Sequence, residues 1–398
     1  METRELILLP VLKANRGANG GLVLTQKYLD GAAEYAKSWP GPVTTLAEIS
    51  DKRTTDMDHV EVLPGSAETG LELRPADEAA LAKRLEGAAA ALAFLSPYEE
   101  STMRLCKSIG VPLLCVSEST PRSERQEVDA NTRNPVLRLR RKLWLMGAER
   151  ARQRMLPRLA GLQCSGVPTY DLYKPRQPNA LLFFDNRVWR EDVIGAQALE
   201  ARLARVRSGD PLRLVFGGRL IPMKGVLELP EVARALVSMD IPFTLDIYGS
   251  GPLEDRLAAR IAALGLQDRV NLKGALDFRT GWIPSLQREA DLFVCCHLQG
   301  DPSSTYPEVM SCGVPIVGYD NDAFQGIVRY SDAGWQTPMK KPGLLAGEIA
   351  RLHRDRKALA DASSRARAFA MQHDFETTFA RRTRHMIDAS RLPEHLKG

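Results

Sequence analysis

The stretch DPSSTYPEVMSCGVPIVGYDN, residues 301–321, contains a carboxylate, Glu308, that a ligand could contact. The apolar runs DLFVCC and IVGY predict buried strands, and between them a short helix carries Glu308 in its first turn. Gly313 and Pro315 are suited to end that helix. In such strand-helix-strand crossovers, ligands bind beyond the carboxyl ends of the strands. Glu308 could accept hydrogen bonds from two neighbouring hydroxyls, as on a ribose, or it could only favour the helix dipole.

The start of this helix has its own chemistry. Proline suits the first helical position, so we expect Pro307 there, with Thr305 or Tyr306 as the N-cap. Free N–H groups at a helix start carry partial positive charge and can hold a phosphate.

Three further glycine-containing turns follow predicted strands. GANGG, residues 17–21, could approach a phosphate closely, although a plain strand-to-helix turn also uses glycine. GGRLIPMKG, residues 217–225, carries Arg219 and Lys224, which could neutralise a diphosphate or could be ordinary surface cations. GSGP, residues 249–252, is a tight turn that lets a ligand pass near the backbone.

The elements that position these residues alternate along the chain. The 398 residues favour two domains, and strands alternate with helices in both halves, which predicts mainly parallel sheets with helices on both faces. The polar stretch 200–211 reads as a linker. We therefore expect an N-terminal α/β domain over 1–205, a second over 211–375 and a C-terminal helix over 376–398.

Composition narrows the function classes. A net charge of +5 is mild and does not indicate nucleic acid. The N-terminus lacks the pattern of a secretory signal, and no apolar run is long enough to span a bilayer. The six cysteines show no CxxC spacing, so we expect buried, reduced thiols in a cytoplasmic protein.

One strongly basic stretch, residues 133–158, interleaves arginines with leucines and Trp144. A basic amphipathic helix can lie on an anionic membrane surface. The other interpretation, which we favour, is a solvated helix that packs its leucine face on a core.

The combination of motifs is more specific than any one of them. GGRL…KG, YGSGPLEDRL and PEVMSCGVPIVGYD follow one another between residues 217 and 320. This order resembles the C-terminal domain of the retaining GT-B glycosyltransferases of family 4, in particular bacterial members that build exopolysaccharide, lipopolysaccharide O-chain or capsule. The first half fits more loosely, through GANGG. The resemblance implies an α/β, GT-B architecture: two Rossmann-like, doubly wound domains facing across a cleft, with C-terminal helices crossing back to the first domain.

The resemblance also implies roles for residues. Arg219 and Lys224 would hold the donor diphosphate and stabilise the charge that develops on the leaving group. Glu308, as the second acidic residue of the family's E-x7-E motif, would bind the ribose. Gly20 and Gly21 would approach the phosphates from the first domain. The remaining residues expected around the donor are Gly218, Gly249, Gly251, Ser304 and Thr305.

Two departures from the family pattern stand out. Gly300 occupies the position of the first motif glutamate, and the neighbouring Asp301 is the candidate replacement. Many family members carry a His in the loop where VPLLCVSEST offers Glu118, so we expect Glu118 to contact the donor sugar. His297 lies near the same expected cleft and is either structural or a substrate contact.

The expected function is transfer of a sugar, with retention, from a UDP- or GDP-sugar to a polyprenyl-diphosphate-linked saccharide in surface polysaccharide biosynthesis. No DxD-like pair or metal cluster is visible, so we expect a metal-independent enzyme without a covalently bound cofactor. It would work in the cytoplasm, as a peripheral protein on the inner face of the membrane. Alternatives are a sugar-nucleotide 2-epimerase, a glycogen-type phosphorylase, a non-catalytic protein that binds a sugar nucleotide or a partner enzyme and, more weakly, an NAD-type oxidoreductase.

Overall fold

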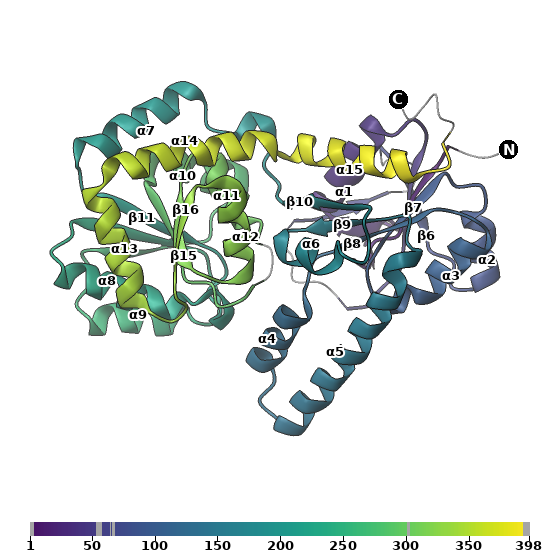
Figure 1. Ribbon diagram of the computed structural model, residues 1–398, viewed down its shortest axis with the longest axis horizontal. Helices are drawn as coiled ribbons and strands as arrows, with labels where there is room; N and C mark the ends of the chain where they lie inside the picture. The colour runs from purple at the N-terminus through teal and green to yellow at the C-terminus, as the bar shows by residue number, and fades with distance from the viewer. Residues whose placement is uncertain (1–3, 53–57, 64, 66–67, 301–302, 393–398) are drawn as a thin grey trace.

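Two parallel sheets, each covered by helices, form the two halves of the molecule (Figure 1). This computed structural model describes residues 4–52, 58–63, 65, 68–300 and 303–392. The first sheet has the strand order β10-β9-β8-β7-β1-β4-β6, and all of its pairings are parallel. Its strands are β1 (Leu6–Leu8), β4 (Val43–Ala47), β6 (Gly70–Leu73), β7 (Ala90–Phe94), β8 (Leu113–Ser117), β9 (Gly161–Ser165) and β10 (Ala180–Phe183).

The second sheet has the order β13-β12-β11-β14-β15-β16 and is also parallel throughout. Its strands are β11 (Leu212–Gly217), β12 (Phe243–Tyr248), β13 (Val270–Gly274), β14 (Leu292–Cys295), β15 (Ile316–Tyr319) and β16 (Gly334–Thr337). The crossover predicted around Glu308 is confirmed, because β14 and β15 pair in parallel and α11 (Thr305–Ser311) joins them. The helix begins earlier than expected: Ser304 is the N-cap, and Pro307 is the third helical residue.

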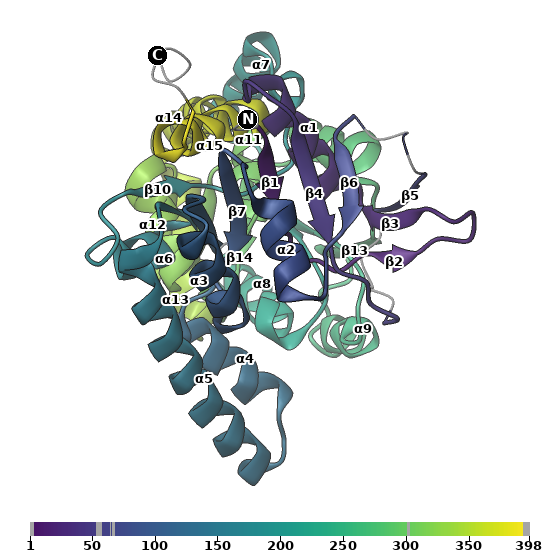
Figure 2. The ribbon, with the colours of Figure 1, turned by 90° about the vertical axis from the view of Figure 1, so that its right-hand side faces the viewer.

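Helices cover both faces of each sheet (Figures 1 and 2). Those of the first half are α1 (Gln26–Ser38), α2 (Glu78–Leu85), α3 (Glu100–Ser108), α4 (Pro121–Asn131), α5 (Pro135–Met155), α6 (Val167–Tyr173) and α15 (Phe375–Ala389). Those of the second half are α7 (Ala196–Ser208), α8 (Leu229–Ser238), α9 (Glu254–Ala263), α10 (Ile283–Glu289), α12 (Asp322–Ser331), α13 (Pro342–Arg354) and α14 (Arg356–Gln372).

Alternation along β1 separates two cores in the first half. Leu6 and Leu8 belong to a core shared with α1 and α15, whereas Ile7 belongs to a core shared with α2, α3 and α6. Successive side chains of a strand point to opposite faces of the sheet, so both faces of β1 are buried. Because α15 packs on the first sheet although it follows the second, the expected return of the C-terminal helices is confirmed (Figure 1).

Two local expectations are wrong. The stretch 200–211 is mostly helix α7 and not a linker. Helix α7 packs against α14, and its buried Arg202 donates to the carbonyl oxygens of Leu286 and Gln287. GANGG does not join a strand to a helix. It is the turn of a hairpin between β2 (Asn15–Arg16) and β3 (Leu22–Thr25), which pairs antiparallel with β5 (His59–Val62).

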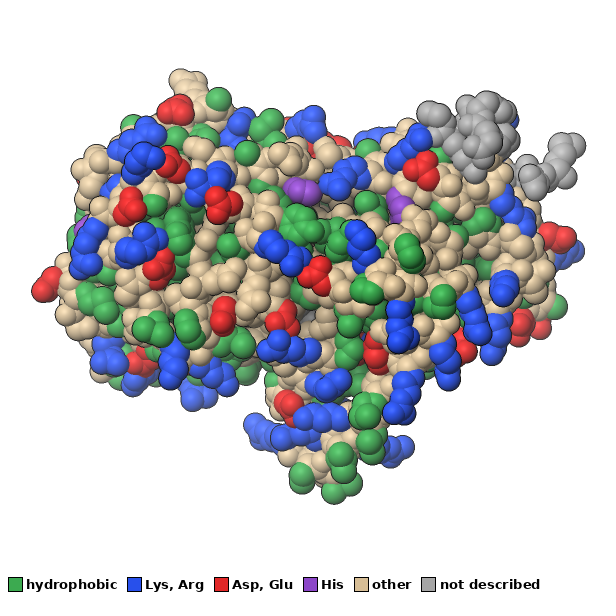
Figure 3. Space-filling model, viewed as in Figure 1, with side chains coloured by type: hydrophobic (Ala, Val, Ile, Leu, Met, Phe, Trp, Pro, Cys, Tyr) green, Lys and Arg blue, Asp and Glu red, His purple; other side chains and the backbone are tan. Residues whose placement is uncertain are grey.

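Helices α4 and α5 form a hairpin that projects from the first half (Figures 1 and 2). The favoured interpretation, that the leucine face of the basic stretch packs on a core, is wrong for most of that face, since Leu139, Leu143 and Trp144 are exposed. Hydrophobic and basic side chains lie together on the projecting hairpin (Figure 3).

Candidate functional site

Glu308 lies between the two halves and is only 4 % exposed. Its Oε1 is 3.5 Å from Nε of Arg187, which belongs to the loop after β10, and makes no hydrogen bond among the described residues. Burial raises the pKa of the Glu308 carboxyl, and the charges of Arg187 and Lys27 oppose that shift. A buried carboxylate oxygen without a hydrogen-bond donor is costly, so a ligand hydroxyl that donates to it would be stabilised there.

A second ion pair lies beside this carboxylate. Lys27, at the start of α1, donates from Nζ to Oδ2 of Asp185 at 2.6 Å. Desolvation lowers the pKa of Lys27, but Asp185 and, more weakly, Glu308 raise it, so that the net shift is upward. The guanidinium of Arg187 also stacks on the ring of Phe278 at 4.2 Å. Segments far apart in the sequence therefore form one polar cluster around Glu308.

The loop after β11 is held by close backbone contacts. Gly218 N–H donates to the Tyr248 carbonyl at 3.1 Å, and Leu220 N–H donates to the Ser250 carbonyl at 2.9 Å. Gly249 has φ +126°, and a Cβ there would lie 1.9 Å from the Gly218 carbonyl oxygen. The glycines of the GSGP turn, Gly249 and Gly251, thus allow that turn to pack on the loop that carries Arg219.

The two cations of this loop have different surroundings. Arg219 is exposed and has no ion pair among the described residues. Lys224 is half-buried, and its charge acts on Cys295 and His297 at the end of β14. Leu298 N–H donates to the Met223 carbonyl at 2.9 Å, which fixes this loop against the segment after β14. Lys224 and α11 therefore share one region, whereas no hydrogen bond or ion pair in the described part of the chain joins Arg219 to Glu308.

His297 is buried, and burial together with the Lys224 charge lowers its pKa well below the usual value. Its Nδ1 is 3.4 Å from the Tyr306 hydroxyl, and its Nε2 has no hydrogen-bond partner among the described residues. The ring is therefore a neutral imidazole between Lys224 and α11.

Four other residues expected around the nucleotide-sugar lie in two separate places. Ser304 and Thr305 are half-buried at the start of α11. Gly20 and Gly21 lie in the β2–β3 turn, where Gly21 N–H and Asn19 N–H donate to the Glu61 carboxylate at 3.0 and 2.8 Å. The pocket that these two glycines line is formed by the first half alone, so the structure does not bring them to Glu308.

Gly300, at the position where the family pattern has a glutamate, lies at a contact between the two halves. Asp301 lies outside the described residues. A Cβ on Gly300 would lie 3.3 Å from the Asp322 carboxylate, and Gly300 N–H donates to Gln126 of α4 at 3.3 Å. Asp322 pairs with Arg122, also of α4, at 2.7 Å. Helix α4 of the first half therefore contacts the second half beside Gly300.

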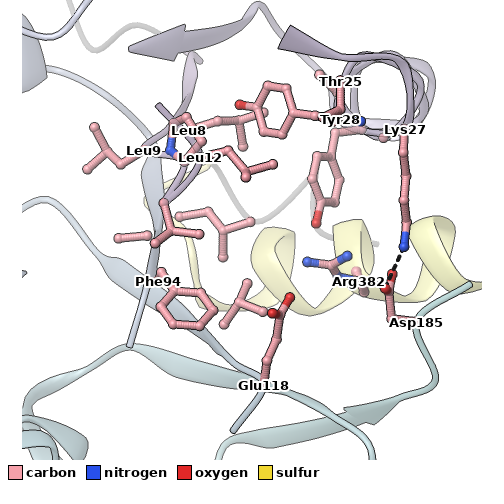
Figure 4. Close-up of a pocket in the computed structure, with 18 of the residues that line it drawn as sticks. Leu8, Leu9, Leu12, Thr25, Lys27, Tyr28, Phe94, Glu118, Asp185 and Arg382 are labelled. Carbon is pink, nitrogen blue, oxygen red and sulfur yellow. Dashed lines mark hydrogen bonds and ion pairs between the residues drawn. The ribbon is translucent and has the colours of Figure 1, made fainter. Parts of the chain in front are cut away.

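A pocket of about 250 Å³ opens at the carboxyl ends of β1, β7 and β8 (Figure 4). Glu118 projects into it opposite Lys27 and Asp185, so these groups share one lining (Figure 4). Most of the other lining is apolar, from side chains such as Leu8, Leu12 and Phe94.

One cation of this pocket comes from the distant helix α15. Arg382 is buried, and its guanidinium lies 4.2 Å from the Phe183 ring and 4.9 Å from the Phe379 ring. Its Nε donates to Gln163 at 2.8 Å, and it has no ion pair among the described residues. The Tyr35 hydroxyl, on the same pocket, is buried without a hydrogen-bond partner in the described chain. A buried cation that makes no ion pair within the described chain can attract an anionic ligand.

Sequence reasoning did not identify Lys27, Asp185, Arg187 or Arg382. Asp185 and Arg187 directly follow the strand ALLFF, and polar residues just beyond a buried strand are a usable signal. Lys27 and Arg382 carry no such signal, because tertiary packing alone brings α1 and α15 to the site.

No helix among the described residues is long and apolar enough to cross a membrane. All six cysteines are buried, as expected, and none is in a disulfide.

Residues 200–369 match the family model described as "Glycosyl transferases group 1". The chain is 26 % identical over 166 residues to the "Putative colanic acid biosynthesis glycosyltransferase WcaL" of Salmonella typhimurium, covering 40 % of each chain. It is 26 % identical over 196 residues to the "Amylovoran biosynthesis glycosyltransferase AmsK" of Erwinia amylovora, covering 44 % of this chain and 47 % of that protein. The matched region thus spans less than half the length of these curated relatives.

The fold is similar to solved structures over almost its whole length. The crystal structure of Anabaena Alr3699/HepE in complex with UDP superposes with a TM-score of 0.64 at 14 % identity, covering 97 % of this chain and 100 % of that one. The GT-B architecture of two Rossmann-like halves is thereby confirmed.

Proposed function

We propose that this protein is a retaining glycosyltransferase of family 4 that moves a sugar from a nucleotide-sugar to a polyprenyl-diphosphate-linked saccharide in surface polysaccharide biosynthesis. The observation that carries the proposal is Glu308, a buried carboxylate whose Oε1 accepts no hydrogen bond among the described residues, within the segment that matches the group 1 glycosyltransferase model. The names of the curated relatives support the polysaccharide context.

In this proposal the donor lies against the second half. Glu308 accepts hydrogen bonds from the ribose, and Arg219 and Lys224 face the diphosphate. Negative charge grows on the leaving diphosphate as the glycosidic bond breaks, and preorganised cations stabilise that charge in the transition state. The proposed reaction uses these side chains and no metal ion. UDP is the first nucleotide to test, because the structurally similar Alr3699/HepE is in complex with UDP.

The acceptor would enter from the first half, through the pocket lined by Glu118 and Arg382. Arg382 suits an anionic group such as a lipid-linked diphosphate, because it is buried and has no ion pair among the described residues. Glu118 is placed to contact a sugar hydroxyl in the same pocket (Figure 4).

Calorimetric titration with UDP, GDP, dTDP and ADP tests the donor site. We expect saturable binding of one nucleotide, and loss of at least tenfold in affinity in the double variant Arg219→Ala, Lys224→Ala, because charge-assisted contacts to a diphosphate are lost. The matched control is Arg256→Ala, Lys341→Ala, which removes two exposed cations elsewhere in the second half. Failure of the folded protein to bind any of the four nucleotides would refute the proposal.

The second candidate is a non-catalytic protein that binds a sugar nucleotide, favoured by Gly300 at the position of an acidic motif residue. Release of nucleoside diphosphate from the sugar nucleotide in the presence of membrane extract distinguishes the two. Binding with turnover supports the enzyme, and binding without turnover supports the second candidate.

A further inference from the structure

Helix α5 presents a row of apolar side chains to solvent. Val136, Leu139, Leu143 and Met146 follow one another at spacings of three and four residues, which places them on one face of the helix. Leu139 is 60 % exposed and Leu143 is 58 % exposed. We call these four residues the outer stripe; at 1.5 Å per residue it is about 15 Å long.

The outer stripe is not the face on which α5 packs. Leu145, Ala148 and Met155 are buried and form the packed face. A surface helix normally has one apolar face, which packs on the core. The outer stripe is a second apolar face that is exposed, so it does not stabilise the fold by packing. The α4–α5 hairpin also projects from the body of the protein, and hydrophobic side chains are exposed on it (Figures 1 and 3).

Cations without acidic partners border the outer stripe. Arg140 follows Val136 by four residues, and Arg150 follows Met146 by four, so each lies next to the stripe. Both are exposed, as is Arg133 before the helix, and none of the three has an ion pair among the described residues. By contrast, Lys142 on the α4 side is paired with Asp129.

Two aromatic side chains lie at the flank of the helix. Trp144 is half exposed, and its ring centroid is 6.2 Å from that of Tyr98, which is also exposed. Trp and Tyr are enriched at membrane-water interfaces because each combines an apolar ring with a polar group.

We propose that the α4–α5 hairpin docks this protein on an anionic lipid surface. The outer stripe enters the headgroup layer, and Arg133, Arg140 and Arg150 lie against the lipid phosphates. A second copy of this chain is a poorer fit, because pairing two stripes would bring unpaired arginines of both copies together. This inference rests on the hairpin alone and does not depend on the proposed reaction.

Sedimentation with vesicles tests the inference. We expect the protein to sediment with vesicles of phosphatidylglycerol and phosphatidylcholine and not with phosphatidylcholine alone. Arg140→Gln, Arg150→Gln should weaken partitioning at least tenfold, because each basic residue near an anionic surface contributes roughly fivefold. Leu139→Ser, Leu143→Ser should abolish it. The control Leu344→Ser, Arg256→Gln changes an exposed leucine and an exposed arginine of the second half and should bind like the unchanged protein.

Tryptophan quenching by brominated lipid gives a second readout. Of the five tryptophans, Trp39 and Trp282 are buried, whereas Trp144 is on the hairpin. We expect quenching that disappears in Trp144→Phe. Equal binding to neutral and anionic vesicles, or quenching that persists in Trp144→Phe, would overturn the inference. So would a dimer that Leu139→Ser, Leu143→Ser dissociates, in a protein that does not bind vesicles.

Discussion

At the residue scale, Glu308, the residue proposed to bind the donor ribose, carries an energetic cost. Its carboxylate is buried, and the charges of Arg187 and Lys27, together with a hydrogen bond from Ser304, offset part of its desolvation. Buried ionised groups without full hydrogen bonding destabilise the folded state. A ligand that donates to this carboxylate would offset part of that cost, so binding and folding are coupled at one side chain.

The raised pKa predicts how stability depends on pH. Because the folded protein binds the Glu308 proton more tightly than the unfolded chain does, the contribution of Glu308 favours folding below the usual pKa of 4.5 and is lost as the pH rises through the folded pKa. We therefore expect the free energy of unfolding, relative to Glu308→Gln, to fall over the pH range above about 4.5. Urea denaturation of both proteins across this range measures the difference; a difference that grows with pH would contradict the assignment.

The residue scale also shows what the sequence could predict. Glu308 could be identified because its helix, its two strands and Gly313 are contiguous in the chain. Lys27 and Arg382 could not, because they reach the cluster and the pocket through packing between distant segments. The roles expected for Asp301, Gly20 and Gly21 stay predictions.

At the element scale, glycines determine how the cation-bearing loop lies against its neighbour. A Cβ at Gly249 would overlap the Gly218 carbonyl, and φ there is +126°, so Gly249→Ala should destabilise the protein by about 2 kcal/mol or more. It should also weaken nucleotide binding, because the loop with Arg219 must shift. Urea denaturation and calorimetry check both effects.

The matched control is Gly343→Ala, near the start of α13, where an added Cβ meets no atom within 4 Å and the backbone is unstrained. It should leave stability unchanged or raise it by about 0.5 kcal/mol. Equal effects of the two glycine substitutions would show that the close approach at Gly249 is unimportant.

The type of an element could be predicted where it follows from local sequence pattern. It could not be predicted where it depends on pairing between strands far apart in the chain. The strands around GGRL and GSGP follow from short apolar runs. The hairpin at GANGG is not predictable from local pattern, because β3 pairs with β5, a strand more than thirty residues away. The stretch 200–211 looks polar partly because of Arg202, yet that side chain is buried and its guanidinium donates to the carbonyl oxygens of Leu286 and Gln287.

At the scale of the whole molecule, α15 ties the end of the chain to the first sheet. Phe379 contacts Tyr35 and Phe375, with ring centroids 4.8 and 4.6 Å away, beneath the pocket that holds Arg382. Phe379→Ala should lower the free energy of unfolding by roughly 3–5 kcal/mol, the usual cost of removing a buried phenyl ring. Thermal denaturation measures it; a loss under 1 kcal/mol would mean that α15 is not part of the first core.

The two halves also meet through ion pairs: Arg122 with Asp322, and Arg329 with Asp171 at 2.9 Å. These side chains are largely exposed, so each pair stabilises the arrangement by less than about 1 kcal/mol. Contacts this weak would allow the halves to move relative to each other in the proposed reaction.

The most direct test of the central claim is a titration that changes only the ribose. With the base that binds, the ribonucleoside diphosphate should bind at least tenfold more tightly than its 2′-deoxy counterpart, because a hydroxyl donating to a buried carboxylate is a strong hydrogen bond. Glu308→Gln should reduce that preference to about threefold or less. Equal binding of the two nucleotides by the unchanged protein, or an undiminished preference in the variant, would contradict the assignment of Glu308 to the donor ribose.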